Sequence, residues 1–157
     1  MSADETLLGQ TPSQTVGPFF AYGLTPTQYG YPFASIAGPV LADETTKGTR
    51  IRLEGRVLDG AGQPVPDALV EIWQADGEGR YAGEPGANHA FTGFGRCGTG
   101  VEPGGLFVFE TVKPGRVGAR APHVNVIVTM RGLLSHAFTL IYFADEEAAN
   151  AQDEVLA

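Results

Sequence analysis

Cysteine is nearly missing from this chain of 157 residues, because Cys97 is the only one. A lone cysteine cannot form a disulfide within the chain, and it cannot supply the several thiolates of a cysteine-rich zinc site. The sequence therefore excludes a small fold held together by disulfides, and it excludes a fold built around a cysteine-rich zinc cage.

Positive charge and long apolar runs are scarce as well. The chain has 10 Lys and Arg residues against 18 Asp and Glu residues, which gives a formal net charge of −8 at pH 7. That balance argues against a nucleic-acid partner. No segment approaches the ~20 apolar residues that span a membrane, and the opening MSADETLLGQ is acidic where a signal peptide would be basic and apolar. We therefore expect a soluble, cytoplasmic protein that binds neither nucleic acid nor membrane.

Glycine and proline, in contrast, are abundant, with 22 and 11 residues. This composition favours a loop-rich β architecture. The length suits one domain with one sizeable core and is too short for two ordinary domains. We expect a single domain overall, in which residues 1–48 form a wrapping arm and residues 49–157 form a β-sandwich.

Alternating or β-branched segments predict about five to seven strands. They lie at residues 51–59, 68–75, 91–96 and 137–143 and on both sides of Lys113-Pro114-Gly115. A turn signal at residues 59–62 predicts that the first two strands form a hairpin-like unit. At Asp145 the sequence changes to DEEAANAQ, in which an N-cap aspartate and early glutamates predict a short helix. The predicted fold class is an all-β sandwich with a loop-rich N-terminal arm and a short C-terminal helix.

The arm, residues 1–48, shows no sustained periodicity, yet it is rich in aromatic residues. It contains five prolines and six aromatics, namely Phe19, Phe20, Tyr22, Tyr29, Tyr31 and Phe33. Disordered tails are poor in aromatic residues, so we expect the arm to dock on a surface that buries its rings. That surface is either the chain's own sandwich or a neighbouring subunit.

The stretch from Gly105 to Met130 contains the main candidate site. Alternate residues of a strand share a face, so His123 and Asn125 are expected to point to the same side, beside the rings of Phe107 and Phe109. An H-x-H pair at this place would suggest a bound metal. The H-x-N pair weakens that interpretation considerably.

Each candidate residue also has a structural interpretation. Tyr81 is either a phenolate ligand or acid/base group, or a tyrosine at a strand edge with its hydroxyl in water. His123 is either a ligand or a buried, hydrogen-bonded histidine. Trp73 is most simply interpreted as core packing, and salt bridges are the simplest explanation for Glu110 and Arg131.

Several segments together resemble the intradiol ring-cleaving dioxygenases. In order and spacing, the resemblance rests on LEGRVLDGAGQPVPDALVEIWQADGEGRY, FGRCGTG, GGLFVFETVKPG and RAPHVNVIV. It runs over nearly the whole chain. The resemblance implies a sandwich fold and a non-haem ferric ion held by two tyrosinates and two histidines. The enzymes of this family open catechol-type rings between the two hydroxyls.

The resemblance implies that only half of the iron site is present in this sequence. Tyr81 matches the first tyrosinate and His123 the first histidine. Phe107 is assigned to the second tyrosinate position, and Asn125 to the second histidine position. A phenyl ring has no oxygen, and a carboxamide is a poor ligand for ferric iron. The resemblance therefore implies a metal-free α subunit in an α/β hetero-oligomer, whose Fe(III) is bound by an iron-bearing β subunit.

The resemblance further implies that this chain helps to wall the substrate pocket of its partner. Thr15, Gly17 and Pro18 are the candidates for that wall, since glycine permits close backbone approach and proline fixes a turn. Arg131 is the candidate cation, because an arginine can hold an anionic aromatic acid through charge-assisted hydrogen bonds. The implied substrates are a small aromatic acid and O₂.

Two other functions stay open. The segment GRVLDGAGQPVPDALVEIW alone also resembles sandwich modules that scaffold, so the alternative is a non-catalytic binding or scaffolding module. A self-sufficient homomeric dioxygenase is disfavoured by the missing ligands. Family members of this type usually continue past the helix at Asp145 with more strands, so the chain is expected to be C-terminally truncated or completed by another polypeptide.

Overall fold

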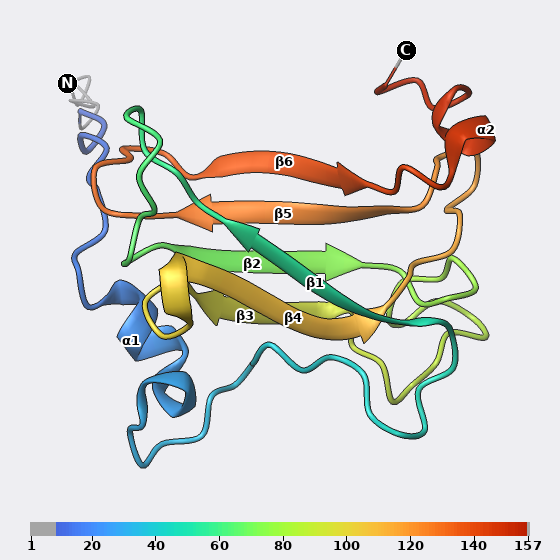
Figure 1. Ribbon diagram of the computed structural model, residues 1–157, viewed down its shortest axis with the longest axis horizontal. Coiled ribbons are helices and arrows are strands. Elements are labelled where there is room, and N and C mark those ends of the chain that lie inside the picture. Colours follow the sequence, from blue (N-terminus) through green and yellow to red (C-terminus); the bar gives the residue numbers. More distant parts are fainter. Residues whose placement is uncertain (1–8, 157) are drawn as a thin grey trace, which may run out of the picture.

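The computed structural model describes residues 9–156, whose strands form two layers (Figure 1). The elements, in which η marks a short 3₁₀ helix, are α1 (Phe20–Leu24), η1 (Pro26–Tyr29), β1 (Arg50–Arg56), β2 (Leu69–Gln74), β3 (Phe94–Gly98), η2 (Pro103–Gly105), β4 (Leu106–Val112), β5 (His123–Thr129), β6 (Ala137–Tyr142) and α2 (Glu147–Asn150). These six strands and the late short helix confirm the predicted all-β sandwich. Residues 1–8 of the predicted arm and Ala157 lie outside the described residues.

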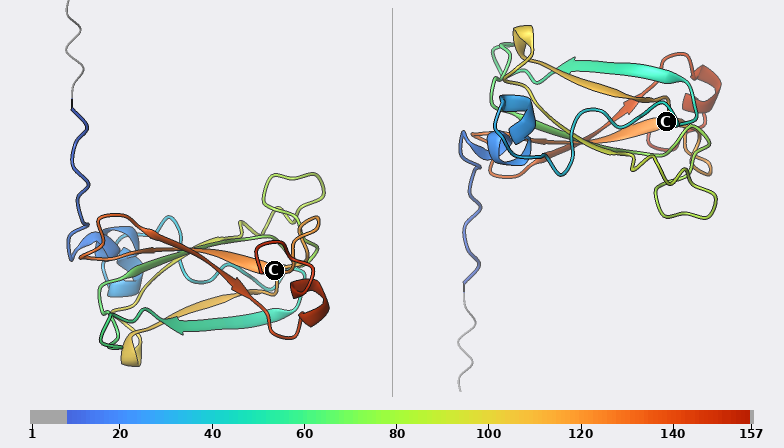
Figure 2. Two further views of the ribbon diagram at one scale, coloured as in Figure 1. Left: turned by 90° about the horizontal axis from the view of Figure 1, so that it is seen from above. Right: turned by 90° about the horizontal axis from the view of Figure 1, so that it is seen from below.

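Two antiparallel sheets pack face to face, as the edge-on views show (Figure 2). One has the strand order β3-β2-β5-β6, and the other consists of β1 and β4. β1 and β2 are not neighbours in these sheets, so the predicted hairpin-like unit is wrong. The turn residues after β1 close a local loop instead, in which the Val65 N–H donates to the Val57 carbonyl over 2.8 Å. The chain then crosses to the other sheet.

The core lies between the two sheets and is filled by alternate strand residues. Phe109 of β4, Ile72 of β2 and Val124 of β5 are all almost fully buried there. Burial of one such large apolar side chain contributes about 1.5–3 kcal/mol. His123 and Asn125 alternate with the buried valines of β5 and so project from the opposite, outer face of the four-stranded sheet.

Strand β2 places a glutamine inside and a tryptophan outside. Gln74 is fully buried, and its side chain donates to the Val112 carbonyl over 2.8 Å and accepts from the Thr111 hydroxyl over 3.0 Å. These bonds cross from one sheet to the other and satisfy the buried amide. Trp73 is 39% exposed on the outer face, so its interpretation as core packing is wrong.

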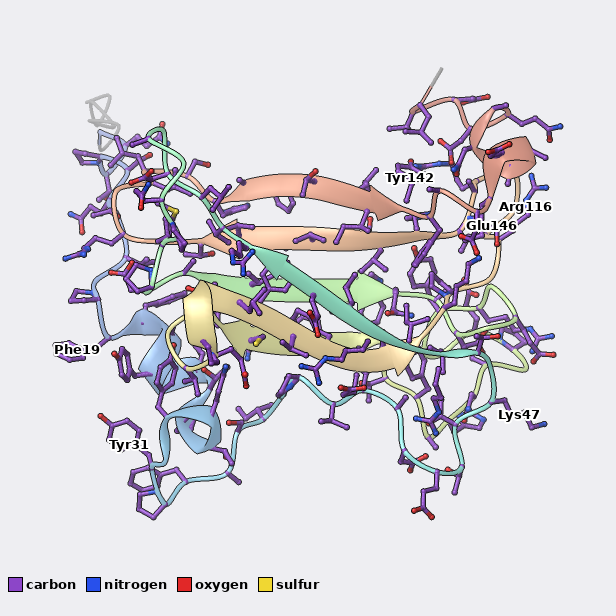
Figure 3. All side chains as sticks on the ribbon, in the orientation of Figure 1. Phe19, Tyr31, Lys47, Arg116, Tyr142 and Glu146 are labelled. Atoms are coloured by element: carbon purple, nitrogen blue, oxygen red, sulfur yellow. The ribbon has the colours of Figure 1, made fainter. Side chains whose placement is uncertain are left out.

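The arm folds in part on its own sandwich. Gln28 hydrogen-bonds the backbone of Gly98 through both of its amide atoms, at 2.8 and 2.9 Å. Tyr22 and Tyr29 stack with their ring centroids 4.1 Å apart. Other aromatic side chains are not covered, and Figure 3 shows Phe19 and Tyr31 pointing away from the sandwich. The expectation that the arm buries its rings on its own sandwich is therefore confirmed for part of the arm only.

The C-terminal segment after β6 contains the short helix α2. Its N-cap residue is Glu146, which makes no side-chain capping bond, so the predicted cap by Asp145 is wrong. The Asp145 carboxylate instead accepts from Lys113 Nζ over 2.8 Å, because it faces the loop that leaves β4. None of the helices within residues 9–156 has the length and apolar character needed to span a lipid bilayer.

Candidate functional site

Tyr81, His123 and Asn125 meet at one end of the four-stranded sheet. The Tyr81 hydroxyl lies 3.4 Å from His123 Nε2 and 3.2 Å from Asn125 Nδ2. His123 and Asn125 come from the start of β5, whereas Tyr81 comes from the loop that follows β2. The structure therefore brings together three of the four residues that the sequence assigned to the iron-ligand positions.

Asp76 organises the loop that carries Tyr81. It is buried, and its Oδ1 accepts backbone hydrogen bonds from Glu78 at 2.9 Å and Arg80 at 3.0 Å. Its Oδ2 accepts a third bond from the Asn88 N–H at 3.2 Å. A carboxylate bonded in this way fixes a turn that strand pairing cannot hold. Tyr81 is thus delivered to β5 by a loop with a defined local structure.

Trp73 covers the ring of Tyr81 on the outer face of the sheet. The two rings are nearly parallel, with an interplanar angle of 7° and centroids 5.7 Å apart. Trp73 also stands opposite Asn125 in the ladder between β2 and β5, and its carbonyl accepts from Asn125 Nδ2 over 3.0 Å. One residue therefore contacts both Tyr81 and Asn125.

His123 is held by the backbone that precedes it. Its side chain is buried, and its Nδ1 lies 2.7 Å from the carbonyl oxygen of Ala121. The N–H of Ala121 donates in turn to the carboxylate of Asp153 over 2.8 Å. The position of the imidazole thus depends on a contact between the loop before β5 and the C-terminal segment.

These residues do not fit a four-ligand ferric site. A phenol oxygen and an imidazole nitrogen are suitable ligands, but the third group presents an amide nitrogen, which has no lone pair to offer. No cluster of three or more His, Cys, Asp or Glu side chains within residues 9–156 could hold a metal ion. The arrangement can connect the loop to the sheet through hydrogen bonds, and it offers only two of the donors that a four-ligand ferric site needs.

Phe107 does not join the other three residues, which corrects its assignment to the second tyrosinate position. Its ring lies between the two sheets, in the core cluster that contains Val124 and Val126. Tyr81 meets His123 and Asn125 on the opposite side of β5. β4 also begins at the end of the sandwich where β5 finishes (Figure 1). Phe107 is the second residue of β4, whereas His123 is the first residue of β5, so the two belong to opposite ends of the sandwich.

The loop between β4 and β5 is the segment that reaches the Tyr81 end of the sheet. A Cβ atom at Gly79 would collide with the carbonyl of Arg116. The Gly115 N–H donates to the Asp76 carbonyl over 2.9 Å. A fourth group beside Tyr81 would therefore come from residues 113–122 and not from the interior of β4.

The other predicted site residues gather at the opposite end of the sandwich. Thr15 Oγ1 accepts from the Gly132 N–H over 2.8 Å, which places the arm next to Arg131. Arg131 pairs with Asp67 through a 3.0 Å contact, as the salt-bridge interpretation predicted. Gly17 and Pro18 are exposed and lead from Thr15 into α1. The structure thus separates the candidate pocket wall from the Tyr81 cluster.

Sequence reasoning missed three residues that shape these two regions. Trp73 could have been found, because Val70, Ile72 and Gln74 alternate with it in β2 and fill the core. Asp76 and Asp67 gave no such signal. Asp76 accepts hydrogen bonds from backbone groups within a turn, and Asp67 pairs with Arg131, which lies far away in the chain.

A family model and several known proteins that are similar to this chain are all described as dioxygenases. The family model described as Dioxygenase matches residues 27–138. A protocatechuate 3,4-dioxygenase alpha chain from Burkholderia cepacia is 54% identical over 154 residues, which cover 96% of this chain and 78% of that protein. A protocatechuate 3,4-dioxygenase beta chain from the same organism is 47% identical over 73 residues, which cover 43% of this chain and 30% of that protein.

Solved structures share the fold. The dioxygenase domain of a dioxygenase carbohydrate-binding protein fusion from Streptomyces sp. SirexAA-E matches with a TM-score of 0.65 at 24% identity. The match covers 94% of this chain and 84% of that chain. At this level of identity the likeness concerns the sandwich architecture alone.

Proposed function

This chain belongs to the intradiol ring-cleaving dioxygenase family, and from this premise we propose that it acts as the α subunit of a protocatechuate 3,4-dioxygenase. The observation that carries the proposal is the 54% identity to such an α chain across 96% of this sequence. The enzyme would cleave the ring of protocatechuate between its two hydroxyls with O₂ and release a carboxy-muconate.

We further propose that the Fe(III) is bound by a β subunit and not by this chain. The donor set supports this division, because Asn125 supplies an amide nitrogen where a ligand would need a lone pair. Bound to the partner, the ferric ion would make the catecholate electron-rich enough to react with O₂. A cytoplasmic location stays a prediction from the sequence.

The contribution of this chain would be to complete the pocket of its partner. Thr15, Gly17 and Pro18 are exposed on the arm and are proposed to form part of the wall. Arg131, whose side chain is 62% exposed, is proposed to hold the carboxylate of the substrate. Orientation of the ring and exclusion of water are tasks that such a wall can perform without a metal of its own.

The alternative of a non-catalytic sandwich module has less support. Such a module would match its relatives through the segment GRVLDGAGQPVPDALVEIW alone. The similarity to the α chain instead continues through 96% of this chain, including the arm and the strands that follow. A scaffolding role therefore has no observation that favours it over the proposed one.

Co-expression with a protocatechuate 3,4-dioxygenase β chain tests the proposal. The two chains should co-purify, contain iron, and consume protocatechuate and O₂. This chain alone should hold no stoichiometric iron and cleave no ring, and the β chain alone is the control for activity. About one iron per chain in the isolated protein, with a red-brown tyrosinate absorption band, would contradict the proposed division of roles.

A further inference from the structure

Tyr81, His123 and Asn125 have no part in the proposed function, yet they form a complete hydrogen-bonded group. We propose that these three side chains form a metal-free clamp that fastens the loop after β2, residues 75–93, to the outer face of β5. The clamp is defined as the Tyr81 hydroxyl with the His123 and Asn125 atoms that contact it.

The backbone of β2 fixes the orientation of the Asn125 amide. The same side-chain atom lies 3.0 Å from the Trp73 carbonyl oxygen and 3.2 Å from the Tyr81 hydroxyl. A carbonyl oxygen only accepts, so the atom that faces it must be the amide nitrogen, which only donates. That nitrogen therefore donates to Tyr81 as well, and the phenol oxygen acts as its acceptor.

The backbone before β5 fixes the imidazole in the same way. His123 Nδ1 lies 2.7 Å from the Ala121 carbonyl oxygen, so Nδ1 carries the hydrogen. In the neutral imidazole Nε2 is then the acceptor, and it faces the Tyr81 hydroxyl at 3.4 Å. Tyr81 accordingly donates to His123 and accepts from Asn125. With the imidazole neutral, the three contacting groups satisfy one another without an ion.

Spacing alone would not exclude a cation from this place. A tetrahedral site with metal–ligand bonds of about 2.0–2.1 Å separates neighbouring ligand atoms by about 3.3–3.4 Å. The separations here are 3.4 and 3.2 Å. Asn125 makes the difference, because turning its oxygen toward Tyr81 would leave the Trp73 carbonyl facing the site without its donor. The backbone of β2 therefore opposes the rearrangement that a metal would require.

The clamp gives the loop its hydrogen bonds to β5. Asp76 organises the loop internally, and the Glu84 carboxylate accepts from the Tyr81 N–H over 2.9 Å within the same loop. Within residues 9–156, the hydrogen bonds between this loop and β5 all involve the Tyr81 hydroxyl. Stacking on Trp73 adds contact area, but it does not hold the Tyr81 hydroxyl in a particular direction. Loss of the hydroxyl should therefore loosen the loop selectively.

Hydrogen exchange measured by mass spectrometry on the full chain tests the clamp. Tyr81→Phe keeps the stacked ring and removes both hydrogen bonds, and Asn125→Asp keeps the shape and replaces the donor with an acceptor. Each should raise amide exchange in residues 77–90 by about three- to tenfold. Thr129→Val is the matched control, because Thr129 lies on the same face of β5 and its hydroxyl makes no hydrogen bond within residues 9–156. In Thr129→Val, residues 77–90 should exchange at the same rate as in the unmodified chain.

Titration of the unmodified chain with ferric and zinc ions completes the test. We expect no saturable binding of either ion. Stoichiometric binding that Tyr81→Phe abolishes would overturn the clamp. Exchange rates unchanged in both variants would also overturn it, but they would leave the proposed α-subunit function intact, so the two ideas can fail separately.

Discussion

Asp153 and Arg120 are 33 residues apart in the sequence, yet Arg120 Nε lies 3.0 and 2.9 Å from the two carboxylate oxygens of Asp153. Asp153 is fully buried and also accepts backbone hydrogen bonds from Ala121 at 2.8 Å and Val155 at 3.0 Å. This contact attaches the segment after α2 to the loop that leads into β5. Because the Ala121 carbonyl accepts from His123, the same contact helps to position the clamp.

The substitution Asp153→Asn should destabilise the protein. An amide cannot accept from Arg120, Ala121 and Val155 at once, because one of its two groups is a donor. We expect the Tm to fall by about 4–10 °C in a thermal melt followed by circular dichroism. Glu154→Gln is the control, since Glu154 is exposed, and it should melt like the unmodified chain. Equal Tm values for the two variants would show that the buried contact has no net effect.

Acid should weaken the same contact. Burial raises the pKa of Asp153, but the hydrogen bonds from Val155, Arg120 and Ala121 outweigh burial and lower the pKa from 3.8 to about 2. A carboxyl whose pKa is lower in the folded state stabilises that state above its unfolded pKa, and the effect is lost as the pH falls from about 4 to about 2. Urea unfolding across this range should show a steeper loss of stability in the unmodified chain than in Asp153→Asn. Parallel curves would contradict the assignment.

Gly79→Ala should cost more stability than Gly83→Ala. Both glycines have positive φ, 81° and 91°, so alanine is strained at each by about 1–2 kcal/mol. A Cβ at Gly79 would also collide with the Arg116 carbonyl, whereas a Cβ at Gly83 would meet nothing within 4 Å. Urea unfolding should therefore give a larger loss for Gly79→Ala. Equal losses of stability in the two variants would mean that the segments around Gly79 and Arg116 can move apart at little cost, and would contradict the prediction.

The exposed arm aromatics should act in assembly and not in folding. Phe19 and Phe33 are 76% and 67% exposed, whereas Tyr29 packs against Gly98 and Tyr22. Phe19→Ser with Phe33→Ser should weaken co-purification with the β chain and leave the Tm unchanged. Tyr29→Ala should instead lower the free energy of unfolding by about 2–3 kcal/mol. Full retention of the β chain by the double variant would argue against an arm that reaches a neighbouring subunit.

The strand segments could be predicted from the sequence because each carries its own alternation. Partner choice could not, since the pattern of β1 is equally compatible with β2 and with β4 as a neighbour. The orientation of β2 was also ambiguous, because Trp73 and Gln74 are adjacent and the polar residue is the buried one. Its burial depends on Val112 and Thr111 in the other sheet, which no local pattern reveals.

The candidate site, like the fold, was predictable only in part. Tyr81, His123 and Asn125 were assigned to one place by resemblance, and the structure brings them together. Phe107 was assigned by resemblance as well, and that assignment was wrong, because nothing in the pattern of β4 says which of its faces is the interior. Its ring belongs to the core, and the residues near Tyr81 come from the irregular loop after β4, where no periodicity guides an assignment.

Arg131 is expected to act on the substrate bound by the partner. It lies just after β5, its side chain is 62% exposed, and the adjacent Gly132 contacts Thr15 of the arm. Its ion pair joins it to Asp67, whose side chain is 14% exposed, so the solvent-facing donors of the guanidinium stay available for a second carboxylate. In the reassembled enzyme, Arg131→Ala should remove one charge-assisted contact of roughly 1.5–3 kcal/mol, which corresponds to about a tenfold to hundredfold rise in KM with little change in kcat.

Asp67→Asn is the matched control, because it removes the ion pair and keeps the cation. A purely structural role predicts a similar loss of Tm and normal kinetics in both variants, so an unchanged kcat/KM for protocatechuate in Arg131→Ala would refute the role in substrate binding.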